Sequence, residues 1–501
     1  MANGEAEATQ SLSRKRFWLV TGLLSLGQLM VVLDVSIVNV ALPSIRTDLG
    51  FSEAGLAWVV NGYALAYAGF LLLGGRAADL FGRRRIFVLG LAVFTLASLA
   101  GAVAPNGLVL VIARVAQGIG GAILSPATLT ILTTTFTTPA QRGKALGVWS
   151  AVAGGGAAIG TVLGGVLTGL LSWRWILLVN LPLGVLGIVG AYLLLVESRG
   201  GSPADIQGGG QRRSLDLGGA ALVTTGLVAL VYGTINSGEQ GWGAVTTLVP
   251  FVGGLVLLAW FVVHEHRIAA APLLPLGLLR LGSVAVGNAS MFLLATGVVA
   301  HFFFLTLYLQ NVLGWSPLAA GLAFLPGAAA MTVGAYAGPA LLKLIPLRVL
   351  LVTGPLLSTA GLAWLSLLPL QATYAVHLLV PMVLVTLGAG IAMMPLALAA
   401  TGGVPRSEAG VASGLINTTR QVGGAVGLGV LAAVAASVTG GSADPALQVS
   451  GQRAAFVVAA AFTLAAALIP LVGLRTRPAP AAAEQRPAEQ PTDRLADTEV
   501  G

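Results

Sequence analysis

The sequence predicts an all-α protein that crosses a membrane many times. Hydrophobic residues make up 56% of its 501 residues and charged residues only 9%, whereas soluble globular proteins carry about 25% charged residues. A chain this long with so few charges cannot cover itself with a water-facing surface, so lipid must surround most of it. The 68 glycines agree with this interpretation, because small residues allow membrane helices to approach closely.

Apolar stretches long enough to cross a membrane recur fourteen times along the chain. Spanning the hydrocarbon takes about 20 helical residues. The first six helices are expected near residues 17–41, 53–74, 86–104, 107–133, 144–171 and 175–196. Two more are expected near 217–236 and 244–264, and the last six near 284–311, 317–341, 348–369, 375–400, 407–437 and 453–474.

These spans divide the chain into five parts. We expect an N-terminal cytoplasmic tail (1–16), a six-helix bundle (17–196), a linker with two extra transmembrane helices (197–283), a second six-helix bundle (284–474) and a cytoplasmic tail (475–501). The tail is rich in Pro, Ala and Glu, a composition typical of disorder. The two extra helices carry little polar material, so we expect them to pack at the periphery.

The distribution of positive charge predicts the orientation of the chain. Of the 26 Lys and Arg residues, Arg114 and Arg420 fall within expected spans, and Arg46, Arg174 and Arg453 fall on the side opposite the termini. All the others lie on the side of the termini. Since Lys and Arg accumulate on the cytoplasmic side, both termini are expected in the cytoplasm. The same bias explains the net charge of +8 without a nucleic-acid partner.

The two six-helix blocks echo each other. The fifth expected helix of each block carries glycines at the same spacing, Gly143, Gly147, Gly156 and Gly160 in the first and Gly410, Gly414, Gly423 and Gly427 in the second. Internal repeats packed about an axis are a common plan of membrane transporters. Two related bundles are therefore expected.

Several functional classes are disfavoured by what the sequence lacks. It has no cysteine and only four scattered histidines, so we expect no metal site and no cofactor. It has no Gly-x-x-x-x-Gly-Lys-Ser/Thr loop for a nucleotide. No intramembrane His/Asp cluster or serine–base arrangement indicates an enzyme. A membrane sensor would usually carry a sizeable soluble domain, and none is expected.

The loop after the second expected helix contains an acid, two glycines and a basic cluster, with Gly75, Asp79, Gly82, Arg83 and Arg84 as its key positions. An acid there can accept hydrogen bonds from a helix N-terminus or a basic residue. The pattern resembles the signature loop of the major facilitator superfamily. The resemblance implies a conformational latch that holds helices in one access state. The alternative is a loop whose arginines only set topology.

The first expected helix contains an acid, Asp34, well inside the span, within a stretch from Leu33 to Pro43. The stretch is similar to the first-helix motif of the fourteen-helix drug:proton antiporters. A charge at this depth costs at least about 2.5 kcal/mol, so intramembrane acids usually face a cavity and have a function. The resemblance implies that Asp34 carries the coupling proton. The alternative is a structural hydrogen bond, for example to Asn39.

The fourth expected helix contains Arg114, Gln117 and Gly118 in an order that resembles the buried-arginine motif of the same family. Arginine keeps its proton in proteins, so inside a membrane it needs an acceptor. Asp34 is the natural candidate, directly or through water. The alternative is an arginine that extends to the membrane interface.

The fifth expected helix carries Gly156, Gly160, Gly164 and Gly165, similar to the glycine-rich motif of exporters in the superfamily. The resemblance implies gating glycines. The family motif has a proline where this chain has Thr161, which removes a preset kink and puts gating in doubt. Simple helix packing is the alternative.

Two further stretches resemble the fourteen-helix subfamily, Trp173 to Gly184 and Gly414 to Gly424. The second contains Arg420, which has no acid within the spans of its own half. Contacts of Arg420 with carbonyl groups are slightly favoured over a contact with an anionic group on a substrate.

His301 lies beside three phenylalanines and can relay protons or contact a ligand, but an interhelical hydrogen bond is favoured.

The resemblance covers residues 17–474. It implies a monomeric proton-coupled antiporter in the bacterial cytoplasmic (inner) membrane that exports lipophilic drugs, antibiotics or related small molecules by alternating access in the bilayer. Polar residues expected to line its cavity are Trp58, Asn61, Tyr63, Gln117, Asn180, His301, Tyr308, Gln310, Asn417, Arg420 and Gln421. A metabolite or nutrient transporter of the same fold remains the alternative, and a membrane sensor is a weaker one.

Overall fold

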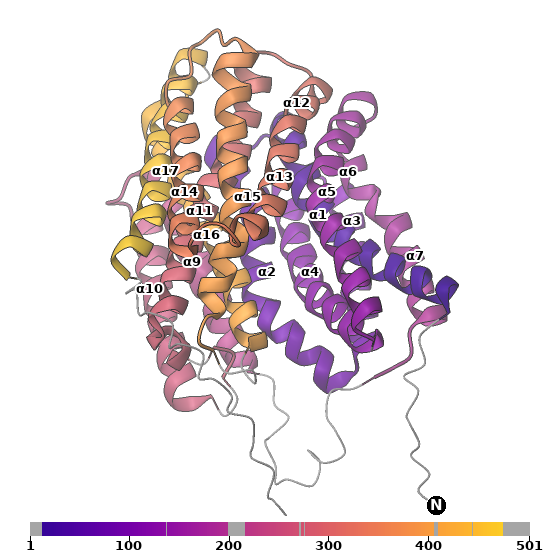
Figure 1. Ribbon diagram of the computed structural model, residues 1–501. Coiled ribbons are helices and arrows are strands. Elements are labelled where there is room, and N and C mark those ends of the chain that lie inside the picture. The colour runs from indigo at the N-terminus through magenta and orange to yellow at the C-terminus, as the bar shows by residue number, and fades with distance from the viewer. Residues whose placement is uncertain are drawn as a thin grey trace, which may run out of the picture.

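The computed structural model describes residues 13–136, 138–198, 216–269, 272–274, 276–404, 409–442 and 444–473. The expected C-terminal tail and most of the segment 197–215 lie outside these residues. The described chain forms long helices that run side by side in two groups (Figure 1).

The first group starts with long helices and ends with a broken one. Its members are α1 (Arg14–Leu49), α2 (Glu53–Phe81), α3 (Arg83–Ala102), α4 (Gly107–Thr135), α5 (Pro139–Leu170), α6 (Trp175–Leu178) and α7 (Asn180–Leu194). The break between α6 and α7 falls at Val179 because Pro182 cannot donate to the carbonyl of Leu178 and its ring crowds that group. Together α6 and α7 occupy the position of the sixth expected span.

The second group contains α11 (Gly282–Leu307), α12 (Pro317–Ala323), α13 (Leu325–Leu341), α14 (Leu347–Leu365), α15 (Val380–Thr401), α16 (Ala409–Thr439) and α17 (Pro445–Gly473), with short π-helical turns at Tyr308–Val312 and Tyr374–Leu379. Its packing repeats that of the first group. The pairs α2–α4, α3–α4, α1–α5 and α3–α7 correspond to α13–α15, α14–α15, α11–α16 and α14–α17. We call the groups the N-bundle and the C-bundle.

Glycines allow the corresponding fifth helices to pack closely in both bundles. In the N-bundle, a Cβ on Gly160 would lie 3.0 Å from the carbonyl oxygen of Leu33 on α1. In the C-bundle, a Cβ on the equivalent Gly427 would lie 2.3 Å from Cγ2 of Thr296 on α11. This pair of the glycine echo therefore marks equivalent helix contacts.

Helix length and composition identify a multi-pass membrane protein. Within the described residues, twelve helical segments are long and apolar enough to cross a membrane. Two shorter apolar stretches, Gly55–Leu71 and Ile159–Leu170, lie within α2 and α5. The structure thus supports twelve spans by this measure, and the expected fourteen remain a prediction.

The two bundles share a hydrophobic core in only one half of the molecule. The shared core joins the C-terminal half of α1 and the N-terminal half of α2 to the C-terminal half of α11 and to α12. This distal half is remote from the start of α1 and the end of α17. In the other half, residues of α1–α4 and residues of α11–α16 form separate clusters. The bundles are therefore joined at the distal end.

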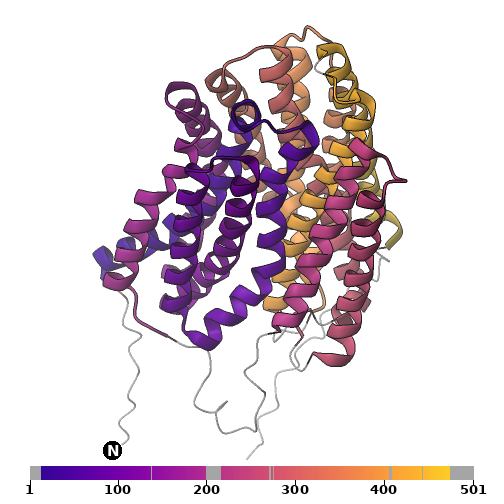
Figure 2. The same cartoon turned by 180° about the vertical axis from the view of Figure 1, so that it is seen from behind.

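The two extra helices, α9 (Leu217–Gln240) and α10 (Val245–Val263), differ in position. The expectation that both are peripheral is wrong for α9, which packs against α2 and α16 at the junction of the bundles (Figure 2). Leu227, Val231 and Ile235 of α9 belong to the shared core. Helix α10 contacts mainly α9 and is peripheral. Lipid-facing and protein-facing sides of such helices are both apolar, so composition did not distinguish them.

The distal contact between bundles depends on close approach of α5 and α12. A Cβ on Gly165 would lie 2.8 Å from the carbonyl oxygen of Pro317, whereas a Cβ on Gly169 would lie 3.8 Å from Leu318, an ordinary contact. Gly165→Ala should force the two helices apart at a cost of about 1–3 kcal/mol, and Gly169→Ala should not.

This difference is measurable with one introduced thiol, since the chain has no cysteine. Ala41 is fully buried in the shared core. In an Ala41→Cys background, Gly165→Ala should increase the rate of maleimide labelling and Gly169→Ala should leave it unchanged. Equal rates in the two variants would contradict a role of Gly165 in distal closure.

Candidate functional site

A buried ion pair joins α1 to α4. Asp34 Oδ2 lies 2.5 Å from Arg114 Nη1, and the side chains are 0% and 2% exposed. The structure thus brings the two expected partners together far from water. A buried pair is tolerated only when its remaining donors and acceptors are also satisfied.

Amide side chains satisfy the rest of the Asp34 carboxylate. Gln117 Nε2 donates to Asp34 Oδ1 (3.0 Å) and to Ser98 Oγ (2.7 Å), and Gln117 Oε1 accepts from Arg114 Nη1 (2.9 Å). Asn180 Nδ2 also donates to Asp34 Oδ1 (3.3 Å). Gln117 and Asn180 were expected in a substrate cavity, but both are fully buried and belong to this network.

Arg114 also connects the network to α2. Its Nε donates to the carbonyl oxygen of Val59 (3.0 Å), and its guanidinium carbon lies 4.6 Å from the ring centre of Tyr63. Five elements, α1, α2, α3, α4 and α7, thus meet around one carboxylate. Arg114 does not extend to an interface. Asn39 donates to Val35 rather than to Asp34, but Gln117 and Asn180 of neighbouring helices donate to Asp34, so a structural role of Asp34 stays an alternative.

The network balances one negative charge against one positive charge. Arginine keeps its proton at all working pH values. Loss of the Asp34 charge would leave the buried Arg114 charge without a partner, which is strongly unfavourable. The contact between α1 and α4 therefore depends on this ion pair.

The loop between α2 and α3 is held by a residue that the motif did not indicate. Gly82 has φ +107°, a conformation that favours glycine. Glu197, after the end of α7, accepts from the backbone N–H of Arg84 (3.1 Å) and of Arg85 (3.2 Å). Arg83 N donates to the carbonyl oxygen of Ser198 (2.9 Å).

Glu197 therefore caps the N-terminus of α3 as an acid at a positive helix end. Arg84 Nη1 adds a hydrogen bond to the carbonyl oxygen of Leu195 (3.2 Å). Asp79 was expected to make such contacts, but its side chain lies outside the described set. The sequence signal for Glu197 was its position as an isolated acid at the end of the sixth expected span.

The four expected gating glycines face two different helices. Gly156, Gly160 and Gly164 pack against α1, where a Cβ on Gly164 would lie 2.8 Å from the carbonyl oxygen of Ile37. Gly165 alone faces α12 of the C-bundle. Three of the four thus set packing inside the N-bundle, and one sets the contact between bundles.

The residues expected to line one cavity are dispersed. Trp58 packs on Tyr232 of α9, with ring centres 6.2 Å apart. Gln310 Nε2 donates to the carbonyl oxygen of Val40 (2.7 Å) across the bundles, and the Tyr308 hydroxyl donates to the carbonyl oxygen of Pro369. These contacts stabilise the closed distal half. Asn61 is fully buried at the same level, and neither atom of its amide has a hydrogen-bond partner in the described structure.

His301 does not make the favoured interhelical hydrogen bond. Both ring nitrogens are buried without a hydrogen-bond partner among the described residues. The ring instead lies 4.9 Å from the ring centre of Phe302 and 6.2 Å from that of Phe324. The prediction was wrong because neighbouring aromatic rings, rather than polar groups, surround this position.

Arg420 on α16 is the second arginine within a span. Its Nη2 donates to Asn417 Oδ1 one turn earlier (3.1 Å), a side-chain carbonyl oxygen, in agreement with the favoured carbonyl contact. Arg420, Asn417 and Gln421 are all partly exposed. These three side chains share one helix and stay near accessible space.

The extra helices carry a polar cluster that sequence reasoning missed. Asp216 caps α9 by accepting from Gly219 N (2.8 Å) and lies 2.8 Å from His264 Nε2. Burial opposes ionisation of Asp216, but the hydrogen bonds from Gly219 and His264 outweigh it and hold the pKa of Asp216 below its usual value. Glu265 accepts from Leu274 N (2.9 Å). The cluster fixes α9 against α10.

Within the described residues, no group of three His, Cys, Asp or Glu is placed to hold a metal.

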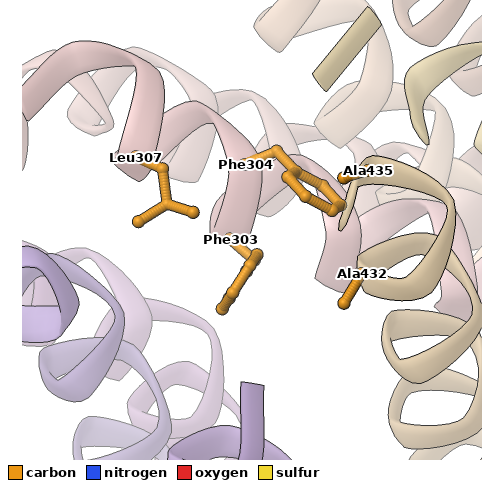
Figure 3. A pocket seen from close by; sticks show the side chains of 5 residues that line it. All are labelled: Phe303, Phe304, Leu307, Ala432 and Ala435. Carbon is orange, nitrogen blue, oxygen red and sulfur yellow. The ribbon is translucent and has the colours of Figure 1, made fainter. Parts of the chain in front are cut away.

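Two apolar hollows flank the shared core. Figure 3 shows one of ≈ 10 Å³ between α11 and α16, lined by Phe303, Phe304, Leu307, Ala432 and Ala435. It is far smaller than the roughly 300–1,000 Å³ of ligand pockets. A wide surface groove of ≈ 390 Å³ between α5 and α13 is lined by Ile159, Val162, Leu163, Val166 and Leu325. Neither hollow contains a polar side chain.

Known proteins share this sequence pattern. Residues 24–428 match the family described as the Major Facilitator Superfamily. The chain is 46% identical to the cephamycin export protein of Amycolatopsis lactamdurans (88% of this chain, 89% of that one) and 42% identical to the puromycin resistance protein of Streptomyces alboniger (93% and 92%). It is 34% identical to the tetracenomycin C resistance and export protein of Streptomyces glaucescens (87% and 79%).

Solved structures share the fold at low identity. A bacterial homologue of the human lysosomal transporter Spinster, inward-facing and occupied, gives a TM-score of 0.61 at 18% identity and covers 92% of this chain and 98% of that chain. A D-xylose–proton symporter gives 0.62 at 15% identity, with 91% and 98% covered.

The buried pair predicts a large and coupled stability effect. Asp34→Asn or Arg114→Gln should each destabilise the protein by about 3–5 kcal/mol, because each leaves one buried charge unpaired. The double variant should cost less than the sum, since no charge remains. Thermal unfolding of the purified protein in detergent measures this difference as shifts of the unfolding temperature.

An exposed ion pair is the matched control. Asp48 accepts from Arg174 Nη1 (2.6 Å), with side chains 45% and 36% exposed. Asp48→Asn should cost only about 0–1 kcal/mol. Strictly additive losses at Asp34 and Arg114 would show that the two side chains do not act as a pair.

Proposed function

Because this chain belongs to the major facilitator superfamily, we propose that it is a proton-coupled secondary exporter of lipophilic antibiotics or related small molecules. The observation that carries the coupling part is the buried Asp34–Arg114 network with its single proton-exchanging group. The export part rests on relatives named for export of or resistance to antibiotics.

We further propose fourteen transmembrane helices with both termini in the cytoplasm, in a bacterial inner membrane. Helices α2 and α5 have 29 and 32 residues, enough to cross a bilayer that requires about 20. Their apolar stretches supply the two spans beyond the twelve. The excess of Lys and Arg on the side of the termini supports the orientation.

In this orientation the distribution of core residues supports an inward-facing state. Among the described residues, the shared core joins the bundles in the extracellular half, whereas the cytoplasmic halves have separate apolar cores. Alternating access then requires the shared core to part while the cytoplasmic halves meet. Gly165 against α12 and the α2–α3 loop held by Glu197 lie at the two ends where contacts must change, which supports their roles in gating and latching.

The coupling follows from the energetics of the pair. While Asp34 is ionised, it binds Arg114, Gln117 and Asn180 and holds α1 against α4 and α7. A proton arriving from the outer side removes the attraction and frees α1 to move. Loss of that proton to the cytoplasm restores the pair. Each cycle thus moves a proton inward while a substrate moves outward.

The central test is transport by Asp34→Asn in proteoliposomes with an imposed pH gradient, with puromycin as the substrate. Gradient-driven accumulation should be abolished, because no group remains to exchange the proton. Exchange of labelled for unlabelled puromycin without a gradient should persist. The Asp34→Asn/Arg114→Gln variant keeps the site neutral and should behave the same, which separates loss of coupling from loss of stability.

Two results would count against the proposal. Normal gradient-driven transport by Asp34→Asn would remove Asp34 from the coupling mechanism. Accumulation in the same direction as the proton flow, rather than against it, would identify the metabolite or nutrient transporter of the same fold. Asp48→Asn, which alters only the exposed pair, should transport like the wild type.

A further inference from the structure

The C-bundle contains a cation that no carboxylate neutralises. Arg420 makes one hydrogen bond, to Asn417 of its own helix, and the described structure gives it no ion pair. From 282 to 473 the sequence has two acids, Glu408 and Asp444. Glu408 lies outside the described residues, and Asp444 accepts from Ala446 N beyond the far end of α16. No acid in the described part of this bundle therefore supplies the counter-charge.

The contrast with Arg114 is direct. Both arginines lie within spans, but Arg114 is 2% exposed and donates to Asp34, Gln117 and the carbonyl oxygen of Val59. Arg420 is partly exposed and keeps free donors on its guanidinium. An arginine has five N–H donors and no acceptor. A charge at membrane depth is costly, and such residues usually face a pathway for solute or ions.

A pair of tyrosines lies on α2, the helix of the opposite bundle that packs against α16. Tyr63 and Tyr67 of α2 stack with ring centres 5.9 Å apart at 23°. Tyr63 is 2% exposed, and its hydroxyl has no hydrogen-bond partner in the described part of the chain. Helices α2 and α16 pack side by side where the two bundles meet (Figure 1).

We propose that Arg420, with Asn417 and the Tyr63–Tyr67 pair, is an anion subsite that takes an aromatic substrate bearing a carboxylate. The guanidinium binds the carboxylate through two parallel hydrogen bonds. The unpartnered Tyr63 hydroxyl supplies a third donor. Tyr63 and Tyr67 are 2% and 4% exposed in this state, so in this proposal their rings meet the aromatic part of the substrate when the two bundles move apart.

The subsite also fits the position of the proton site. The ring of Tyr63 lies 4.6 Å from the Arg114 guanidinium carbon, and α2, which carries Tyr63, packs against α16, which carries Arg420. In this proposal proton and substrate therefore use separate groups, one in each bundle. The assignment of the ligand as a transported substrate rests on the proposed export function, whereas the binding preference itself does not.

Binding is tested with a neutral isostere as internal reference. The full chain in phosphatidylcholine nanodiscs is titrated calorimetrically at neutral pH with 9-anthracenecarboxylate and with 9-anthracenecarboxamide. Wild type should prefer the carboxylate by about tenfold or more, the usual effect of hydrogen bonds to a charged group. Arg420→Gln should abolish the preference while carboxamide binding persists. Because the readout is a ratio within one protein, partial unfolding cannot imitate it.

Two further variants sharpen the result. Lys343→Gln removes an exposed positive charge of the C-bundle and should keep the full preference. Arg420→Lys keeps the charge but loses the planar fork, so it should retain an intermediate preference. An equal affinity of wild type for the two probes would overturn the proposal, as would a preference that survives Arg420→Gln or is lost equally in Lys343→Gln.

The lipid composition of the nanodiscs distinguishes a substrate carboxylate from a lipid headgroup as the bound anion. If phosphatidylglycerol in the nanodiscs abolishes the carboxylate preference, a lipid headgroup occupies the subsite and the substrate assignment is overturned. Puromycin transport, measured in parallel, tests the proposed export function independently of the anion subsite. If Arg420→Gln still transports puromycin and wild type shows no preference for the carboxylate probe, only the subsite is refuted. If wild type does not transport puromycin, the export function is refuted, and the binding preference still tests the subsite.

Discussion

One ion pair, Asp34 with Arg114, constrains the N-bundle. It lies where the shared distal core gives way to the separate proximal core, and side chains from α3, α4 and α7 complete its hydrogen bonds. In a low-dielectric interior neither charge is tolerable alone. The arrangement of these helices therefore depends on the charge of one carboxylate, and the proposed mechanism uses this dependence to link proton binding to helix movement.

The two bundles share a packing plan but differ in charge. Equivalent helices pack through equivalent glycines, as at Gly160 and Gly427. Yet the N-bundle pairs its arginine internally, and the C-bundle leaves Arg420 with a single amide partner. In the proposed mechanism, this difference in charge gives the N-bundle the proton site and the C-bundle the ligand site. Helix α9 covers the junction between them.

Sequence reasoning reached the helix positions and the Asp34–Arg114 pair because lipid imposes strong rules. Long apolar stretches must be helices, and an acid and an arginine at depth need each other. It did not reach the placement of Gln117, His301 or α9. A helix that is apolar on all sides gives no periodic signal of which face points inward. Glu197 was missed because a helix cap supplied from a distant segment depends on tertiary geometry.

Infrared difference spectroscopy of the purified protein tests the coupling most directly, because it observes the carboxylic acid itself. Spectra recorded between alkaline and acidic buffer should contain a C=O band of a buried protonated acid, and Asp34→Asn should remove that band while Asp48→Asn retains it. An unchanged band in Asp34→Asn would show that the proton binds elsewhere and would contradict the account.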